Sequence, residues 1–260
     1  HVDIDRAELG KIKQPHVAIQ GDVAEVLAQL NPQIEAQPRE EWRQLVADLQ
    51  REFPCAIPQE SDPLSHYGLI NAVAACVDDE AIITTDVGQH QMWTAQAYPL
   101  NRPRQWLTSG GLGTMGFGLP AAIGARVGSA REFDNKKPVW LIDGDGSFQM
   151  TSEELAAAFL DRTPVKIALL NNSVYGMVRQ WQTLFYDHHY SATNLLDGEN
   201  TPDIVDVPDF VKLAEAYGCV GMRAFTKDEA IECIKKANEI NDRPVLIDFR
   251  VWKDAMVWPM

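Results

Sequence analysis

Short apolar runs alternate with amphipathic segments along most of the chain, and each run ends at a polar or glycine-rich turn. Runs with the length and β-branched content of buried strands lie at 81–86, 106–109, 139–143, 165–170 and 244–250. Segments with helical spacing of apolar residues lie at 66–77, 91–97, 119–127, 151–160, 176–185, 208–217 and 227–239. Strands that alternate with helices predict an α/β fold with a doubly wound parallel sheet and helices on both faces.

The first 65 residues do not continue this alternation. Residues 1–30 predict one strand and one short helix, which is too little to close a sheet. Residues 31–65 are rich in proline and charge and indicate a connector packed on a surface. We therefore expect the tail of a truncated domain, then this connector, then a compact domain over 66–260. The chain stops at Met260 without a helix or polar tail, and we expect a covering segment to be missing there.

Composition narrows the class of protein. The formal net charge of −14 and the pI near 4.8 argue against nucleic acid or an anionic membrane surface as a partner. No apolar run approaches the ~18 residues that a membrane span needs. None of the cysteines forms a Cys-x-x-Cys pair, so we expect reduced, buried thiols in a cytoplasmic protein. The four are Cys55, Cys76, Cys219 and Cys233.

Two polar motifs follow neighbouring strands of the predicted sheet. Gly144 to Ser147 has the sequence Gly-Asp-Gly-Ser, and Asn171-Asn172 follows the next apolar run. The carboxyl ends of strands are where open α/β sheets bind ligands. Asp145 offers a charged oxygen and Asn172 a neutral one, a pair that suits Mg²⁺ shared between protein and phosphates. The glycines allow close approach of a phosphate, although an isolated Gly-Asp-Gly is most often only a tight turn.

Two further segments lie between a strand and a helix. Asp86 to His90 can direct its amides at a phosphate, although a simple turn with a surface histidine fits as well. Ser109 to Gly118 holds five glycines in ten residues. It has no Lys-Ser/Thr ending and no strict Gly-x-Gly-x-x-Gly, which excludes a P-loop and disfavours a dinucleotide fold. Its glycines suit close approach to an aromatic ring, and Met115 is either a wedge under that ring or core packing.

Three segments resemble one enzyme family. Residues 109–124, 144–151 and 171–182, the last with the sequence Asn-Asn-Ser-Val-Tyr-Gly-Met-Val-Arg-Gln-Trp-Gln, resemble the catalytic large subunit of acetolactate synthase (acetohydroxyacid synthase). This family uses thiamine diphosphate. Residues 66–260 resemble its C-terminal cofactor domain, and residues 1–30 resemble the end of its central, FAD-associated domain.

The resemblance implies a thiamine-diphosphate-binding fold and a carboligase activity in branched-chain amino acid biosynthesis. Pyruvate would be decarboxylated, and its two-carbon unit would be joined to a second 2-keto acid. The implied cofactors are thiamine diphosphate and Mg²⁺, with FAD in the full-length protein. The implied assembly is a cytoplasmic homo-oligomer of catalytic subunits, with a small regulatory subunit as a further candidate partner.

The resemblance also implies a set of site residues. Asp145, Asn172 and the carbonyl of Val174 would bind Mg²⁺. The positions implied for the cofactor are Val87, Gly88, Gln89, His90, Gly113, Met115, Gly144, Gly146 and Ser147. The Met115 side chain would hold the cofactor bent. Trp181 and Met177 would line the pocket of the second keto acid, whereas their spacing alone favours core packing on an amphipathic helix.

Several alternatives remain open on the sequence. In this family a glutamate of the N-terminal domain, supplied by the partner protomer, activates the cofactor, so we expect this chain alone to be inactive. Pyruvate oxidase, sulfoacetaldehyde acetyltransferase and a non-catalytic assembly module are the competing interpretations. A nicotinamide dehydrogenase fails because its fingerprint is missing. The long loop over 187–207 indicates a functional or mobile segment, and its adjacent histidines indicate solvated loop rather than a metal cluster.

Overall fold

The chain forms two compact units, His1–Ala56 and Ile57–Met260. The computed structural model describes residues 1–54, 57–58, 62, 64–132, 137–195 and 208–258. Cys55 and the distal part of the loop predicted over 187–207 lie outside these residues.

The first unit is small and has no buried residue among those described. It contains β1 (Val2–Asp3), η1 (Arg6–Glu8), β2 (Ile19–Gln20), α1 (Val23–Leu30), η2 (Asn31–Gln33) and α2 (Glu40–Glu52). β1 pairs in parallel with β2, so the strand expected at the start of the chain is present but only two residues long. The carboxylate of Asp22 accepts hydrogen bonds from the backbone amides of Ala24 and Glu25, so α1 begins at a side-chain cap.

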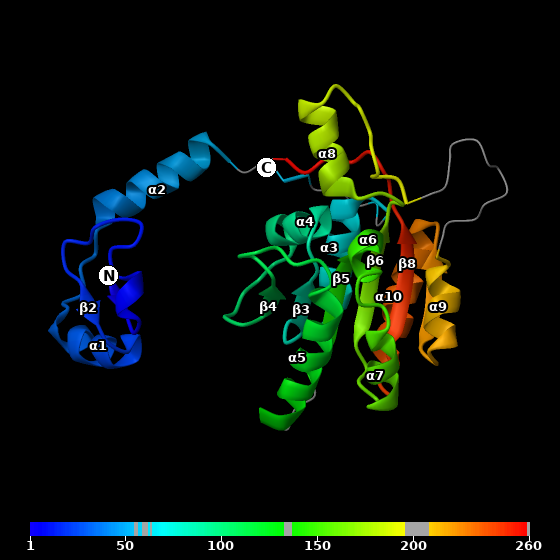
Figure 1. Ribbon diagram of the computed structural model, residues 1–260, viewed down its shortest axis with the longest axis horizontal. Helices are drawn as coiled ribbons and strands as arrows, with labels where there is room; N and C mark the ends of the chain where they lie inside the picture. The colour runs from blue at the N-terminus through cyan, green and yellow to red at the C-terminus, as the bar shows by residue number, and fades with distance from the viewer. Residues whose placement is uncertain (55–56, 59–61, 63, 133–136, 196–207, 259–260) are drawn as a thin grey trace. The chain divides into compact units, whose positions relative to one another are not determined.

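The second unit is built on a six-stranded parallel sheet, which confirms the predicted fold class (Figure 1). The strand order is β4-β3-β5-β6-β8-β7. The strands are β3 (Ile82–Thr85), β4 (Trp106–Thr108), β5 (Val139–Gly144), β6 (Lys166–Asn171), β7 (Val220–Ala224) and β8 (Val245–Arg250). The two central strands, β5 and β6, are buried along almost their whole length, as expected of a sheet covered on both faces.

Successive residues of the central strands enter two different cores, because side chains alternate across a strand. Trp140 and Ile142 pack in one core, and Val139 and Leu141 pack in the other. Helices α3 (His66–Cys76), α4 (Gln89–Ala97) and α10 (Lys227–Glu239) contribute to the first core. Helices α5 (Gly118–Glu132), α6 (Asp145–Phe148), α7 (Glu154–Leu160) and α9 (Phe210–Ala216) contribute to the second.

Several elements differ from the sequence-based expectation, among them β2, which was not predicted, and α5, which ends at Glu132 rather than at 127. β7 was not predicted, because this half-buried edge strand contains Gly221 and Arg223 and shows no apolar run. The helix expected over 151–160 begins only at Glu154, and a separate short helix, α6, precedes it. The helix α4 starts at Gln89, two residues earlier than expected, so two candidate cofactor residues lie in its first turn.

α8 (Gly176–Phe185) lies beyond the end of the sheet at which the strands finish (Figure 1). None of the described helices is both long and apolar enough to cross a lipid bilayer.

Candidate functional site

The candidate site lies where β3, β5 and β6 end. β3 has β4 on one side and β5 on the other, so the order of strands reverses between β3 and β5. Open α/β sheets bind ligands outside the carboxyl ends of their strands at such a reversal. The segments that follow the two strands meet here, because a Cβ added to Gly144 would lie 2.8 Å from Nδ1 of His90. The structure thus brings two of the predicted motifs together.

Asp86 fixes the second half of the glycine-rich loop. Its carboxylate is fully buried and accepts hydrogen bonds from the backbone amides of Val87 (2.7 Å), Gly116 (2.9 Å) and Gly118 (2.6 Å). A Cβ on Gly118 would lie 2.9 Å from the backbone nitrogen of Asp86, so only glycine lets α5 start this close to β3. The loop is therefore attached to the end of β3.

The first half of the same loop is exposed. Gly113 has a φ of 75°, a left-handed conformation that favours glycine. A Cβ there would lie 3.6 Å from the Val87 side chain, which places this part of the loop beside the segment after β3. Met115 is 36% exposed. Gly113 and Met115, two of the positions that the resemblance implies for the cofactor, are therefore both accessible to a ligand.

A second buried carboxylate, that of Asp143, lies at the end of β5. It accepts hydrogen bonds from Oγ of Ser147 at 2.5 Å and from the amide of Gly144 at 2.8 Å. Burial and the neighbouring Asp86 raise the pKa of Asp143 well above its usual range. His90 Nε2 lies 3.8 Å from Asp143 Oδ1, but burial lowers the pKa of His90 to about 3. At neutral pH this imidazole therefore carries no charge that would compensate the carboxylate.

Asp145, the first residue of α6, lies against the turn that follows β6. Burial raises its pKa to about 7, and hydrogen bonds from backbone amides, those of Ser173 and Asn172 among them, oppose that rise. Oδ1 of Asn172 accepts a hydrogen bond from the amide of Val174 at 3.2 Å, and Ser173 has a φ of 60°. The Asp145 carboxylate therefore faces the tight turn that carries both other predicted Mg²⁺ ligands.

Three buried carboxylates, those of Asp86, Asp143 and Asp145, lie at the ends of β3 and β5 and are here called the site carboxylates. Each is at most 3% exposed, and burial raises the pKa of each. The neutral His90 lies 3.8 Å from the Asp143 carboxylate, and Arg250 is close enough to oppose the pKa rise of Asp145. Ionised carboxylates are costly to bury without a cation.

The ligands on offer are oxygens. Where the structure describes the chain, no three His, Cys, Asp or Glu side chains are grouped as a metal site. A cation beside Asp145 would therefore need the amide oxygen of Asn172 and a backbone carbonyl. Such an all-oxygen set, completed by ligand oxygens, suits Mg²⁺ rather than a thiolate-seeking or imidazole-seeking metal.

The glycines in the turns after β3 and β5 leave the backbone uncovered by side chains, so that a ligand can approach it closely. A Cβ on Gly146 would lie 2.7 Å from the ring of Tyr175, and one on Gly144 would meet His90. Gly88 is only partly buried, between the buried Asp86 and Gln89. The turns after β3 and β5 therefore both present backbone with little side-chain bulk, as an anionic ligand requires.

The buried side-chain amides of Gln89 and Gln180 connect the candidate site to the segment 251–258 by hydrogen bonds. Nε2 of Gln89 donates to Oε1 of Gln180 at 2.8 Å and to the carbonyl of Ala255 at 2.9 Å. Oε1 of Gln180 also accepts from the amide of Val257 at 2.9 Å. A Cβ on Gly176 would overlap Oε1 of Gln89. These contacts fix α4, the start of α8 and the segment 251–258 to one another.

The two residues predicted for the second substrate lie differently on α8. Trp181 is 46% exposed and lines a surface hollow of about 650 Å³ with Val178, Phe185 and Tyr186. Met177 is partly buried and is not among the residues that line this hollow. The structure therefore places Trp181 where a ligand can reach it, and the sharing of one pocket with Met177 stays a prediction.

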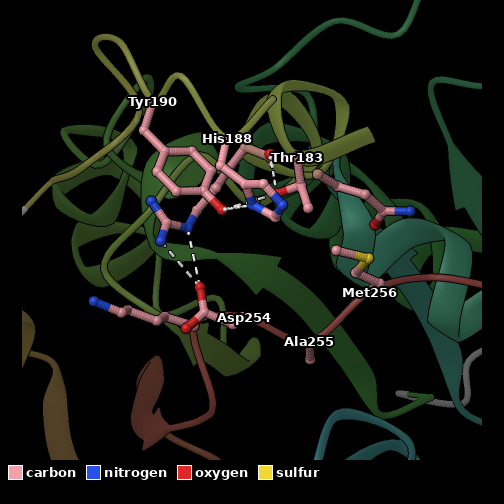
Figure 2. Close-up of a pocket in the computed structure, with 10 residues that line it drawn as sticks. Thr183, His188, Tyr190, Asp254, Ala255 and Met256 are labelled. Carbon is pink, nitrogen blue, oxygen red and sulfur yellow. Dashed lines mark hydrogen bonds and ion pairs between the residues drawn. The ribbon is translucent and has the colours of Figure 1, made fainter. Parts of the chain in front are cut away.

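A second cavity, of about 310 Å³, separates α8 from the segment 251–258. Figure 2 shows His188, Tyr190 and Thr183 on one side of it and Asp254 to Met256 on the other. Arg179 pairs with Asp254 at 3.0 Å and lies over the ring of Tyr190, 3.7 Å from its centroid. His188 shares a hydrogen bond with the Tyr190 hydroxyl at 3.0 Å within the same loop.

Sequence reasoning missed three residues that organise the site. Asp86 was included only as the start of a possible phosphate turn and Asp143 only as the end of a strand, although an aspartate before a Gly-containing turn is a signal for amide capping. Gln180 gave no signal, because its partners lie 91 and 77 positions away in the chain.

Comparisons with known proteins agree with this geometry. Residues 86–249 match the family model described as "Thiamine pyrophosphate enzyme, C-terminal TPP binding domain". The whole chain is 58% identical to the acetolactate synthase isozyme 1 large subunit of Escherichia coli and covers 44% of it. It is 49% identical to the acetolactate synthase large subunit of Corynebacterium glutamicum, covering 41%, and 42% identical to the chloroplastic acetolactate synthase 1 of Zea mays, covering 40%. The chain thus spans about two fifths of the length of these curated relatives.

Proposed function

The chain belongs to the thiamine pyrophosphate enzymes through their C-terminal TPP-binding domain, and from this we propose that it forms the Mg²⁺ and diphosphate site of an acetolactate synthase. The observation that carries the proposal is the buried Asp145 carboxylate facing the turn of Asn172 and Val174. The acetolactate synthase relatives, which match over the whole chain, support the particular activity.

We assign Mg²⁺ to Asp145, Asn172 and the Val174 carbonyl. The diphosphate is assigned to the turns after β3 and β5, and the pyrimidine ring to the exposed glycine-rich loop. The assigned residues are Val87, Gly88, Gln89, His90, Gly113, Met115, Gly144, Gly146 and Ser147. Thiamine diphosphate, when bound, supplies the electron sink for decarboxylation of a 2-keto acid. The residues of this chain bind and orient it, and the buried carboxylates confine the cation to one position.

In this proposal the reaction consumes pyruvate and a second 2-keto acid and serves branched-chain amino acid biosynthesis. Trp181, in the surface hollow on α8, and Met177 on the same helix are assigned to the second keto acid. The resemblance of residues 1–30 to a FAD-associated domain supports FAD as a further cofactor of the full-length protein. A cytoplasmic homo-oligomer of catalytic subunits, with a regulatory subunit, completes the proposal.

The experiment that tests the cofactor site is the thermal midpoint of the chain with thiamine diphosphate, with Mg²⁺, and with both. A ligand at about 100 times its Kd stabilises a protein by about 2.7 kcal/mol, a shift of a few degrees. We expect the full shift only with both ligands, because the metal links the diphosphate to Asp145. Asp145→Asn should abolish the shift, whereas the matched control Asp161→Asn, at an exposed position, should retain it.

The experiment that tests the activity is product analysis of the full-length protein with pyruvate. An acetolactate synthase makes acetolactate. Acetate or acetyl phosphate would instead identify a different thiamine diphosphate enzyme, and a cofactor-dependent shift without any product would identify an assembly module.

A further inference from the structure

A small cavity lies at the inner side of the candidate site, between α3, α4 and the ends of β5 and β6. Its volume is about 30 Å³. One water molecule needs roughly 10–15 Å³ by this measure, so the cavity has room for a water but not for a phosphate group. It is lined by His66, Gln89, His90, Trp93, Gly144, Leu170, Asn172 and Gly176.

Four of the lining side chains each carry a buried polar atom that has no hydrogen-bond partner among the described residues. The atoms are Nε2 of His66, Oε1 of Gln89, Nε2 of His90 and Nε1 of Trp93. All four residues are at most 5% exposed. A buried polar atom without a partner costs about 1–3 kcal/mol, so four of them around one cavity indicate a shared polar occupant.

The chemistry of these atoms fits one water molecule. The indole Nε1 of Trp93 can only donate, and Oε1 of Gln89 can only accept, because Nε2 of Gln89 is already bound to Gln180 and Ala255. Nε2 of the neutral His90 ring accepts when the other ring nitrogen carries the proton.

Nε2 of His66, as a donor, completes a set of two donors and two acceptors. This set is the complement of a water molecule, which accepts two hydrogen bonds and donates two.

His66 is held firmly enough to organise this site. It is the first residue of α3, directly after Ser65, whose hydroxyl caps the helix by accepting from the amide of Gly68 at 3.1 Å. Its ring packs on Trp93 with 3.9 Å between ring centroids. Core packing alone explains the ring contact, but it does not explain why the polar atoms of both rings border the same cavity as Gln89 and His90.

We propose that this cavity binds one structural water, and that His66 is a positioning residue which acts through this water to hold Gln89 and His90 in the orientation that the diphosphate requires. The water site stands on the cavity and its polar atoms. The effect on the diphosphate rests on the proposed function.

The first test is a high-resolution crystal structure of the full-length protein without cofactor. We expect a water within hydrogen-bonding distance of the four polar atoms. A dry cavity would overturn the proposal, and so would a cofactor oxygen inside the cavity in crystals grown with thiamine diphosphate and Mg²⁺.

The second test compares three variants of the full-length protein by calorimetric titration with thiamine diphosphate in Mg²⁺ and by thermal midpoint. His66→Leu removes the donor and should weaken binding about tenfold, the value of one good hydrogen bond. His66→Gln keeps an N–H and should bind within about threefold of the unmodified protein. Val73→Ala, also buried on α3, should lower the thermal midpoint without changing the Kd.

A Kd for His66→Leu equal to that of Val73→Ala would overturn the positioning role. If His66→Leu does not fold, a weakening of binding by about tenfold or more in His66→Gln would overturn it, because that variant keeps the N–H that the role requires. Failure of the unmodified protein to bind thiamine diphosphate would contradict the proposed function instead, and the cofactor-free crystal would still decide the water site.

Discussion

The buried carboxylate of Asp248 and the site carboxylates differ in how their negative charge is compensated. Asp248 on β8 is fully buried, and its carboxylate accepts from Nε of Arg223 at 2.7 Å and from Nδ2 of Asn171 at 2.9 Å. Arg223 also pairs with Asp209 at 2.6 Å. The site carboxylates at the ends of β3 and β5 have amides, a hydroxyl and a neutral imidazole around them. Asp248 is paired with an arginine of the same chain, whereas in our proposal a bound cation completes the site carboxylates.

This difference in charge compensation suggests different roles: Asp248 and Arg223 stabilise the fold, and the site carboxylates serve ligand binding in our proposal. The Asp248 network also supports the turn over residues 172–174, because Asn171, which donates to Asp248, accepts at Oδ1 from the amide of Ser173 at 3.2 Å. The site carboxylates leave the incoming cation as the main source of positive charge. We therefore expect substitutions in the first group to act on the stability of the ligand-free protein, and substitutions in the second to act on ligand binding.

The largest expected effect is that of Arg223→Met. It leaves the buried Asp248 charge without its cation, which typically costs about 3–5 kcal/mol. Urea denaturation measures the loss. Arg243→Met is the matched control, because Arg243 pairs with Asp242 on the surface and should change stability by less than about 0.5 kcal/mol. Equal effects of the two substitutions would remove the distinction between a structural network and an ordinary surface pair.

Gly118→Ala should have the next largest effect. The added Cβ would meet Leu141 and the backbone of Asp86 at 2.8 and 2.9 Å, so α5 must move away from β3. Such overpacking costs about 1–3 kcal/mol. Gly124→Ala, in the same helix with no atom within 4 Å of the added Cβ, should be neutral or stabilising. Thermal melts of both variants compare the costs directly, and a neutral Gly118→Ala would mean that Asp86 does not fix the loop.

Acid should destabilise the site region through His66. Burial lowers the pKa of His66 to about 3 from its usual 6.5. Between these values the unfolded chain binds a proton that the folded chain does not, so stability is complete above pH 6.5 and falls as the pH decreases. The loss is up to about 1.4 kcal/mol for each pH unit. Denaturation at a series of pH values should show a shallower fall for His66→Gln, and an unchanged slope would mean that His66 is not held neutral.

The smallest expected effect on stability, with a large effect on binding, is that of Asp145→Asn. Removing a carboxylate whose burial already raises its pKa to about 7 should leave the ligand-free protein within about 1 kcal/mol of its original stability or make it more stable. Asp248→Asn should instead destabilise, because it breaks the pair with Arg223. Denaturation of both variants without ligand tests this contrast, and the same loss in both would equate the two groups of carboxylates.

The sequence predicted those parts of the fold that depend on the spacing of apolar and polar residues within one segment. The apolar runs of β3, β5, β6 and β8 were sufficient to predict a parallel sheet, whereas the metal residues predicted in the turns after β5 and β6 stay a prediction. β7 was missed because an edge strand need not be apolar on both faces. The cavity at His66 and the network from Asp248 to Asn171 were missed because each joins residues of distant segments, which no spacing along the chain records.

A crystal structure of the full-length protein with Mg²⁺ and thiamine diphosphate tests the central claim most directly. The account predicts a metal ion at coordination distance from the Asp145 carboxylate, the Asn172 amide oxygen and the Val174 carbonyl, with diphosphate oxygens completing its shell. A metal ion held elsewhere, or a cofactor bound in the crevice without contact to Asp145, would contradict it.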